Sequence, residues 1–369
     1  MKLMHVVGTR PNFPKLAPVF RAARSRGLRQ LVVHTGQHYD DAMSGNFFRE
    51  LDIPEPEVNL AVGSGSHGAQ TARILERIEP VLEKEMPDWL VVYGDVNSTM
   101  AATLAASKLR IRIAHVEAGL RSFDRDMPEE INRLVTDRLA DLLLTPSRDA
   151  GEQLLREGED ASRIAFVGNV MIDSLFHALP NARATGFRKS LALRDGYVVV
   201  TLHRPSNVDV DARLTMIAEA LVRIAESRDV VFAAHPRTQD RLRKAGVGLG
   251  GVRLIDPLPY FHMLDLVEGA HVVVTDSGGL QEETTALGVP CLTVRDNTER
   301  PITITEGTNQ LVLDPRELSA FVEAAFSVTA RCPEGWDGSA GERVVDALTN
   351  PAYANPVRGG AERLSEVMR

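Results

Sequence analysis

The chain has 369 residues, of which 44% are apolar and 25% are charged, a composition typical of a globular protein long enough for two domains. The net charge of −8 and the lack of a basic run argue against nucleic acid or anionic lipid as partners. No stretch reaches the roughly 18 apolar residues that a membrane span needs, and the two cysteines lie outside any metal-ligand spacing, so we expect a cytoplasmic protein without a metal site.

The first half of the chain alternates short apolar runs with longer helical patterns. Helices are expected around residues 16–27, 70–85 and 98–109. Buried strands, each ending in glycine or a polar turn, are expected at 3–8, 29–36, 88–95, 112–119 and 142–147. This alternation predicts a parallel sheet with helices on both faces.

The pattern weakens after residue 166 and restarts with "YVVVTLHRPSN" at residue 197. Further strands are expected at 229–236, 251–257, 271–279 and 289–297. We therefore predict an α/β protein of two Rossmann-like, doubly wound domains that face each other across a cleft. The predicted limits are 1–172, 173–352, and a C-terminal helix at 353–369 that crosses back to the first domain.

The segment "VVTDSGGLQEE" has the features of a diphosphate site. A strand ends at Asp276, and Ser277, Gly278 and Gly279 then open a helix whose backbone N–H groups can bind an anion. Glu282 and Glu283 follow one helical turn later, where a carboxylate can accept hydrogen bonds from a ribose diol. The alternative is a glycine-containing helix cap with exposed glutamates.

Other strand ends carry basic side chains. Gly8, Arg10 and Lys15 lie at the first strand-to-helix turn, where they favour a bound phosphate or carboxylate. His203 and His235, each followed closely by an arginine, end two strands of the second domain and indicate anion binding there. Structural histidines are the alternative for both.

Carboxylates follow two neighbouring strands of the first domain. Asp95 ends one strand, and Glu117 begins a charged stretch that reaches Glu129 and Glu130. Like charges at one site separate the pKa values of carboxyl groups, so that one acts as a base while another holds a proton. The alternative for such a loop is a solvated set of salt bridges. We interpret the charges of residues 117–130 as those of a proton-transfer site for a nucleotide-linked substrate.

Six blocks, in this order, resemble the signature segments of the non-hydrolysing UDP-N-acetylglucosamine 2-epimerases: "GTRPNFPKLAPV", "GDVNSTMAATLAA", "HVEAGLRS…PEEINR", "TLHRPSNVD", "TDSGGLQEE" and "RDNTERP". The resemblance spans about residues 1–350. It implies a glycosyltransferase-B fold and the interconversion of UDP-N-acetylglucosamine and UDP-N-acetylmannosamine, without a cofactor, through a 2-acetamidoglucal intermediate.

The resemblance also assigns roles to matching residues. It implies that Asp95, Glu117 and Glu129 are the acid/base carboxylates and that His203 assists departure of the diphosphate. Glu283 matches the ribose-binding carboxylate. The remaining implied or predicted substrate-binding residues are Arg10, Lys15, His235, Met263, Ser277, Gly278, Gly279 and Arg300. We further expect a homodimer.

The chain departs from the family pattern in two places. Ser206 replaces a common glutamate, and Met263 stands where the family has an aromatic residue that stacks on uracil; a thioether can still pack on a ring face. Such features also resemble epimerases of a 2,3-diacetamido uronic acid UDP-sugar. Gln37, His38 and Arg73 match positions at which some members bind a second UDP-N-acetylglucosamine as an activator.

Three other activities share parts of these patterns. A UDP-sugar-dependent glycosyltransferase has the same fold but does not need three clustered carboxylates. A hydrolysing epimerase releases free N-acetylmannosamine and has a different first loop. A non-catalytic nucleotide-sugar sensor is expected to have lost Asp95, Glu117 or Glu129, and all three are present.

Overall fold

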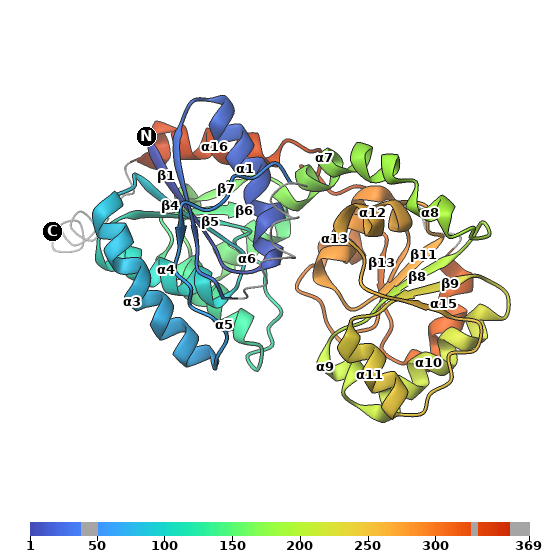
Figure 1. Cartoon of the computed structure of the whole chain (residues 1–369). Coiled ribbons are helices and arrows are strands. Elements are labelled where there is room, and N and C mark those ends of the chain that lie inside the picture. Colours follow the sequence, from blue (N-terminus) through green and yellow to red (C-terminus); the bar gives the residue numbers. More distant parts are fainter. Residues whose placement is uncertain (38–50, 326–330, 355–369) are drawn as a thin grey trace.

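The computed structural model describes residues 1–37, 51–325 and 331–354 of the chain. It contains two parallel sheets, each with apolar clusters on its two faces, in two domains that lie side by side (Figure 1). The predicted fold class is confirmed.

The first sheet has seven strands in the order β3-β2-β1-β4-β5-β6-β7. Their bounds are β1 Lys2–Val7, β2 Arg29–His34, β3 Val58–Asn59, β4 Trp89–Tyr93, β5 Arg112–Val116, β6 Leu142–Thr145 and β7 Ile164–Phe166. The helices of this part are η1 Arg10–Asn12, α1 Phe13–Ser25, α3 His67–Glu85, α4 Asn97–Lys108, α5 Pro128–Leu139, α6 Arg148–Arg156 and η2 Ala161–Arg163. The strand order reverses between β1 and β4.

The second sheet has six strands in the order β10-β9-β8-β11-β12-β13. Their bounds are β8 Val198–Thr201, β9 Val230–Ala233, β10 Arg253–Ile255, β11 Val272–Thr275, β12 Cys291–Thr293 and β13 Asn309–Leu311. The helices are α8 Phe187–Ser190, α9 Pro205–Val208, α10 Asp211–Ala225, α11 Pro236–Lys244, α12 Tyr260–Glu268, α13 Gly278–Leu287, α14 Ile302–Thr305, η3 Pro315–Glu317 and α15 Leu318–Ala324. Here the order reverses between β8 and β11, and open parallel sheets bind ligands beyond the carboxyl ends of their strands at such points.

Strand β4 shows why these sequences are apolar throughout. All five of its residues are buried, and successive side chains point to opposite faces of the sheet. Trp89 and Tyr93 pack into the cluster that contains α1, whereas Leu90 and Val92 pack into the cluster that contains α3 and α4. Because helices cover both faces of this parallel sheet, every side chain of the strand is buried, and the sequence does not alternate between apolar and polar residues.

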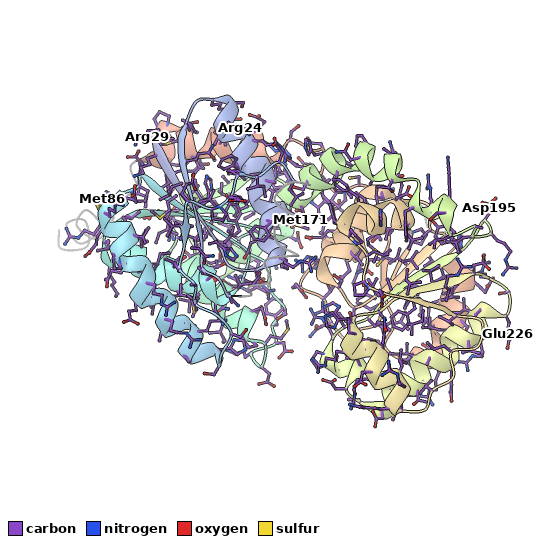
Figure 2. All side chains as sticks on the ribbon, in the orientation of Figure 1. Arg24, Arg29, Met86, Met171, Asp195 and Glu226 are labelled. Carbon is purple, nitrogen blue, oxygen red and sulfur yellow. The ribbon has the colours of Figure 1, made fainter. Side chains whose placement is uncertain are left out.

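Two helices connect the domains. Helix α7 (Val170–Thr185) contacts α1 in the first domain and α12 and α13 in the second. Figure 1 shows it spanning the junction, and Met171 lies there in Figure 2. We propose that the domains divide at residues 172 and 173, within this helix.

Helix α16 (Ala340–Thr349), followed by α17 (Pro351–Ala354), brings the chain back to the first domain. It lies beside α1 in Figure 1, and its apolar residues Val344 and Leu348 belong to the core of the first domain. The Trp89 indole also donates a hydrogen bond to the Leu348 carbonyl over 3.2 Å. The return therefore precedes residue 353, where we predicted it, because the apolar face of α16 completes this core; residues 355–369 lie outside the described part of the chain.

Among the described residues, no helix combines the length and the apolar character needed to cross a bilayer.

The packing of α16 on α1 depends on Gly341. A Cβ at this position would lie 2.7 Å from the Pro18 carbonyl carbon. We predict that Gly341→Ala lowers the free energy of unfolding by about 1–3 kcal/mol, measured by urea denaturation, because the two helix backbones must separate. Gly68→Ala is the matched control: Gly68 lies in α3 with no atom near its absent Cβ, and alanine there should stabilise by about 0.5–1 kcal/mol. Equal denaturation midpoints for the two variants would contradict this account.

Candidate active site

The loops that follow β1, β4 and β5 bring the predicted residues of the first domain together. Lys15 lies in the first turn of α1, Asp95 follows β4 and Glu117 follows β5. These strands are neighbours in the sheet and their carboxyl ends share one edge. The predicted convergence of these segments is therefore present in the structure.

Glu117 is one residue through which the two domains contact each other. Its side chain is buried, and Oε1 accepts a hydrogen bond of 3.0 Å from Nη2 of Arg300 in the second domain. Its other oxygen, Oε2, forms an ion pair with Nζ of Lys15. One carboxylate of the first domain is thus held by one cation from each domain.

Arg300 pairs with two further carboxylates of its own domain. Its Nε lies 2.9 Å from Oε1 of Glu282, and its Nη1 lies 2.8 Å from Oε1 of Glu299. Burial opposes the charge of Arg300, but Glu282, Glu299 and Glu117 outweigh burial and raise the pKa of the guanidinium. The side chain is a permanent buried cation where the two domains touch.

Asp95 is held by residues of α5. Nη2 of Arg133 forms an ion pair with its carboxylate, and Asn132 donates to the Asp95 backbone carbonyl over 2.8 Å. Burial opposes ionisation, but the positive charges of Arg133, Lys15 and Arg300 outweigh it and lower the pKa of Asp95. Asp95 is therefore a carboxylate at neutral pH, as a proton acceptor must be.

The turns that carry these carboxylates have unusual backbone angles. Glu117 itself has a φ of 75°, in the left-handed region that costs a residue with a side chain about 1–3 kcal/mol. Gly94 has a φ of 62°, and a Cβ there would lie 2.6 Å from Nζ of Lys15. The surrounding structure must hold this arrangement, because neither turn would adopt it alone.

The sequence predicts an anion site at the start of α13 in the second domain. The helix begins at Gly278, and Ser277 precedes it with its backbone extended. A Cβ on Gly278 would lie 2.6 Å from Nη1 of Arg300, whereas one on Gly279 would meet only Met171, at 3.9 Å. Gly278 thus lets a guanidinium approach the free N–H groups of a helix N-terminus, a combination suited to a diphosphate.

His203 is oriented by Asp276 at the end of β11. The buried Asp276 carboxylate accepts backbone hydrogen bonds from His203 and Arg204, and Nδ1 of His203 lies 2.8 Å from it. Burial raises the pKa of Asp276, but the contact with His203 outweighs burial and lowers it. Nδ1 is thus engaged, and Nε2 of this exposed ring is left for a ligand.

Glu283 lies one residue beyond Glu282 on α13 and faces Tyr260, whose hydroxyl donates to it over 3.0 Å. Burial raises the pKa of Glu283 to about 7, and the Tyr260 hydrogen bond opposes that shift. Met263, on α12, is half-buried against an apolar cluster of the second domain. Arg10 is half-buried at the start of η1.

Other predicted residues have local partners. His235 caps α11 by accepting from the Arg237 amide, over 3.3 Å. Gln37 accepts a hydrogen bond of 2.8 Å from Ser98, and Arg73 donates to the Ser64 carbonyl over 3.0 Å. His38 lies outside the described residues.

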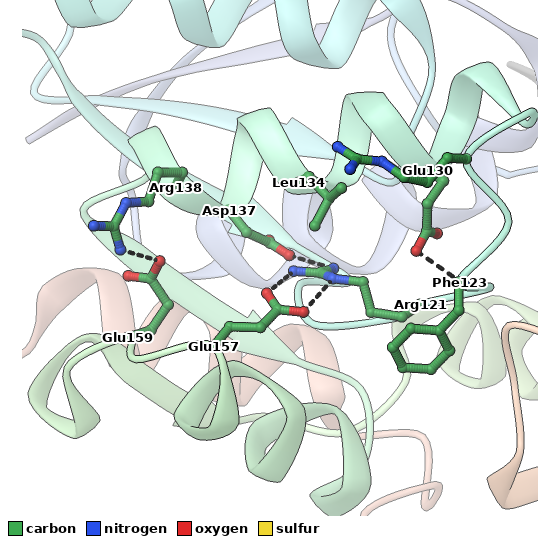
Figure 3. Close-up of a pocket in the computed structure, with 9 residues that line it drawn as sticks. Arg121, Phe123, Glu130, Leu134, Asp137, Arg138, Glu157 and Glu159 are labelled. Atoms are coloured by element: carbon green, nitrogen blue, oxygen red, sulfur yellow. Dashed lines mark hydrogen bonds and ion pairs between the residues drawn. The ribbon is translucent and has the colours of Figure 1, made fainter.

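Much of the charge in residues 117–130 is structural, so our interpretation of that stretch was too broad. Arg121 pairs with Asp137 and Glu157, as Figure 3 shows, beside a hollow of about 570 Å³. Glu130 accepts from the amides of Ser122 and Phe123 and so closes the loop. These pairs bring the loop back onto α5 and leave Glu117 at the cleft.

Glu129 is half-buried in the first turn of α5. Within the described ranges its carboxylate makes no hydrogen bond or ion pair with Asp95, Glu117 or any other residue. The prediction for Glu129 thus rests on the family resemblance.

The residues of α5 that hold Asp95 and the turn after Glu117 in place were not predicted from the sequence. On α5, Glu130, Arg133 and Asp137 recur at helical spacing and are all buried. A charged stripe with this period can face either solvent or a buried site, and no local signal separates the two. Across residues 1–37, 51–325 and 331–354 we find no group of three or more His, Cys, Asp or Glu side chains that could hold a metal ion.

Comparison with known proteins gives a consistent result. The family model described as UDP-N-acetylglucosamine 2-epimerase matches residues 21–349. A UDP-N-acetylglucosamine 2-epimerase of Methanocaldococcus jannaschii is 44% identical over 367 residues, which cover 96% of this chain and 100% of the relative. A UDP-2,3-diacetamido-2,3-dideoxy-D-glucuronate 2-epimerase of Pseudomonas aeruginosa is 45% identical over 330 residues, which cover 88% and 91%.

The fold agrees as well. The crystal structure of the M. jannaschii UDP-GlcNAc 2-epimerase in complex with UDP-GlcNAc and UDP superimposes with a TM-score of 0.86 at 43% identity, covering 95% of this chain and 99% of that one. The resemblance seen in the six sequence blocks and the predicted isomerase class are confirmed. The chain belongs to the UDP-N-acetylglucosamine 2-epimerase family.

Proposed function

We propose that the chain interconverts UDP-N-acetylglucosamine and UDP-N-acetylmannosamine without hydrolysing either. The observation that carries this proposal is the meeting of Glu117 and Asp95 with Arg300 and the start of α13 where the two domains touch. The carboxylates suit proton transfer at a sugar carbon. The cation and the helix N-terminus suit a diphosphate leaving group.

In the proposed reaction, a carboxylate removes the proton from C2 while the bond from C1 to the UDP oxygen breaks. The C–H electron pair becomes the C1=C2 double bond of a 2-acetamidoglucal, and UDP leaves with the pair of the broken bond. A different group, acting as an acid, then protonates C2 on the opposite face, and UDP adds back to C1. Asp95, Glu117 and Glu129 are the candidate acids and bases.

The other residues have roles in binding. Arg300, Ser277, Gly278 and Gly279 hold the diphosphate, with Arg10 and Lys15 contributing from the first domain. His203 stabilises the departing UDP through Nε2, Glu283 binds the ribose diol, and Met263 packs near the base. We keep an activator role for Gln37, His38 and Arg73, and an anion contact for His235, as proposals.

Product analysis tests this function. Purified protein is incubated with UDP-N-acetylglucosamine, and UDP-sugars and free sugars are separated. We expect UDP-N-acetylmannosamine at equilibrium with the substrate. Free N-acetylmannosamine would indicate a hydrolysing enzyme, and transfer of the sugar to an added acceptor would indicate a glycosyltransferase.

A second candidate substrate is the UDP-linked 2,3-diacetamido uronic acid. The 45% identity to the P. aeruginosa relative that bears its name supports this candidate. The two UDP-sugars can be compared by kcat/KM with the same preparation of enzyme. A higher value for the uronic acid would reassign the substrate and leave the reaction unchanged.

We also propose that the chain acts as a homodimer in the cytoplasm. The cysteines support the compartment: Cys291 is buried and Cys332 exposed, and neither forms a disulfide. Light scattering coupled to size exclusion tests the oligomeric state.

Asp95→Asn, Glu117→Gln and Glu129→Gln should each lower kcat by about a hundredfold to ten-thousandfold, because each removes a proton-transfer group. UDP affinity, measured by calorimetry, should change little, since most proposed nucleotide contacts lie on the second domain. Glu152→Gln is the control, because Glu152 is exposed and pairs only at the surface with Arg156. Near-normal turnover in any of the three variants would remove that residue from the mechanism.

UDP affinity should rise with pH around neutrality. Burial raises the pKa of Glu283 to about 7, and only the ionised carboxylate accepts two hydrogen bonds from a ribose diol. The ionised fraction of Glu283, and with it the affinity, should increase about tenfold between about pH 6 and pH 8.

Calorimetry of the parent protein and of Glu283→Gln over this range tests the effect. The phosphate of UDP also titrates, near about pH 6, but it does so equally for both proteins. An identical pH dependence in the two would show that Glu283 does not contact the nucleotide.

A further inference from the structure

His115 lies beneath the two turns that carry the carboxylates of the first domain. It is the fourth residue of β5, and its side chain is fully buried. Its Nε2 is 2.8 Å from the Gly94 carbonyl oxygen, and its Nδ1 is 2.6 Å from Oδ1 of Asp137 on α5. The ring thus touches the residue before Asp95 and a carboxylate from a different element.

The hydrogen-bond partners of His115 define the tautomer of its ring. A carbonyl oxygen only accepts, so Nε2 must carry a proton toward Gly94. Asp137 is a carboxylate: burial opposes its ionisation, but His115 and Arg121 outweigh burial and lower the pKa of Asp137. Nε2 thus donates to the Gly94 carbonyl, and Nδ1 shares a hydrogen bond with the Asp137 carboxylate.

Asp137 also reaches the second turn. Its Oδ2 accepts from the Gly119 amide over 3.2 Å and lies 2.7 Å from Nη1 of Arg121. Figure 3 shows Arg121 held between Asp137 and Glu157, with hydrogen bonds of 2.9 and 2.7 Å to the latter. The position of the Asp137 carboxylate is thereby fixed.

The two turns need such support. Gly94, Glu117 and Gly119 all have positive φ angles, of 62°, 75° and 86°. The His115–Asp137 pair contacts one turn through the Gly94 carbonyl and the other through the Gly119 amide. The His115–Asp137 pair therefore links the turn that carries Asp95 to the turn that carries Glu117.

We propose that His115 and Asp137 are positioning residues, which hold the Gly94–Asp95 turn and the Glu117–Gly119 turn in register for proton transfer at the substrate. Neither touches the substrate. The inference rests on the proposed roles of Asp95 and Glu117.

Two substitutions of His115 separate its two hydrogen bonds. The amide nitrogen of asparagine lies near the position of Nδ1, and that of glutamine lies near the position of Nε2. His115→Asn keeps the bond to Asp137 and loses the one to Gly94, so kcat should fall about a hundredfold, with KM and UDP affinity within about threefold. His115→Gln keeps the bond to Gly94, and kcat should fall less than about tenfold.

His5→Asn and His5→Gln are the matched controls. His5 is equally buried in the same sheet, and its ring contacts Tyr93 and Gln30 but no residue of either turn. Turnover per folded molecule should stay within about threefold of the parent for both, since no proton-transfer group is displaced. Equal losses in His115→Asn and His115→Gln, losses matched by the His5 variants, or normal turnover in His115→Asn would each overturn the proposal.

Nuclear magnetic resonance of the unsubstituted protein provides a test that does not depend on the variants folding. With ¹⁵N-labelled histidine, Nε2 of His115 should carry a proton, because it donates to the Gly94 carbonyl. An unprotonated Nε2 would refute the proposal. Because this measurement needs no substrate, it remains decisive even if the parent enzyme epimerises none of the UDP-sugars tested, an outcome that counts against the proposed function alone.

Discussion

The site depends on one buried cation, the guanidinium of Arg300. It holds Glu282 and Glu299 of its own domain and Glu117 of the other. Removing one partner of a buried ion pair typically costs about 3–5 kcal/mol, because the remaining charge is left without compensation. The contact between Arg300 and Glu117 therefore forms only when the two domains are close together. It places Glu117, a proposed proton-transfer group, beside the proposed anion site.

The rest of the structure positions the two sides of this contact. The strand order reverses between β1 and β4 in the first sheet and between β8 and β11 in the second. The loops that carry the proposed site residues follow strands at or beside these points, so they converge. Gly94 and Gly278 allow Lys15 and Arg300 to approach more closely than any side chain at those positions would permit. Behind the loops, α5 supplies Arg133, which pairs with Asp95, and Asp137, which accepts from the Gly119 amide in the turn after Glu117. Helices α7 and α16 join the domains.

The sequence predicted the parts of this arrangement that local patterns encode. Apolar runs ending in glycine or a polar turn located most of the strands, but not the short strands β3, β7 and β13. The segment "TDSGG" located the start of α13. The return of the chain at α16 was missed because the partner of its apolar face, α1, lies more than 300 positions away in the sequence. The roles of Arg121, Glu130, His115 and Asp137 were missed because buried and exposed charge pairs have the same local sequence. Family resemblance supplied the acid/base assignment of Glu129, which no contact within the described residues tests.

The central claim is that the carboxylates of this cleft exchange the proton at C2 of the sugar. The most direct measurement is the reaction of UDP-N-acetylglucosamine in deuterium oxide, with the product and the recovered substrate analysed by nuclear magnetic resonance. We expect UDP-N-acetylmannosamine to carry deuterium at C2, because the proton removed from one face is replaced on the other face by a group in exchange with solvent. Product that retains protium at C2 throughout would contradict it.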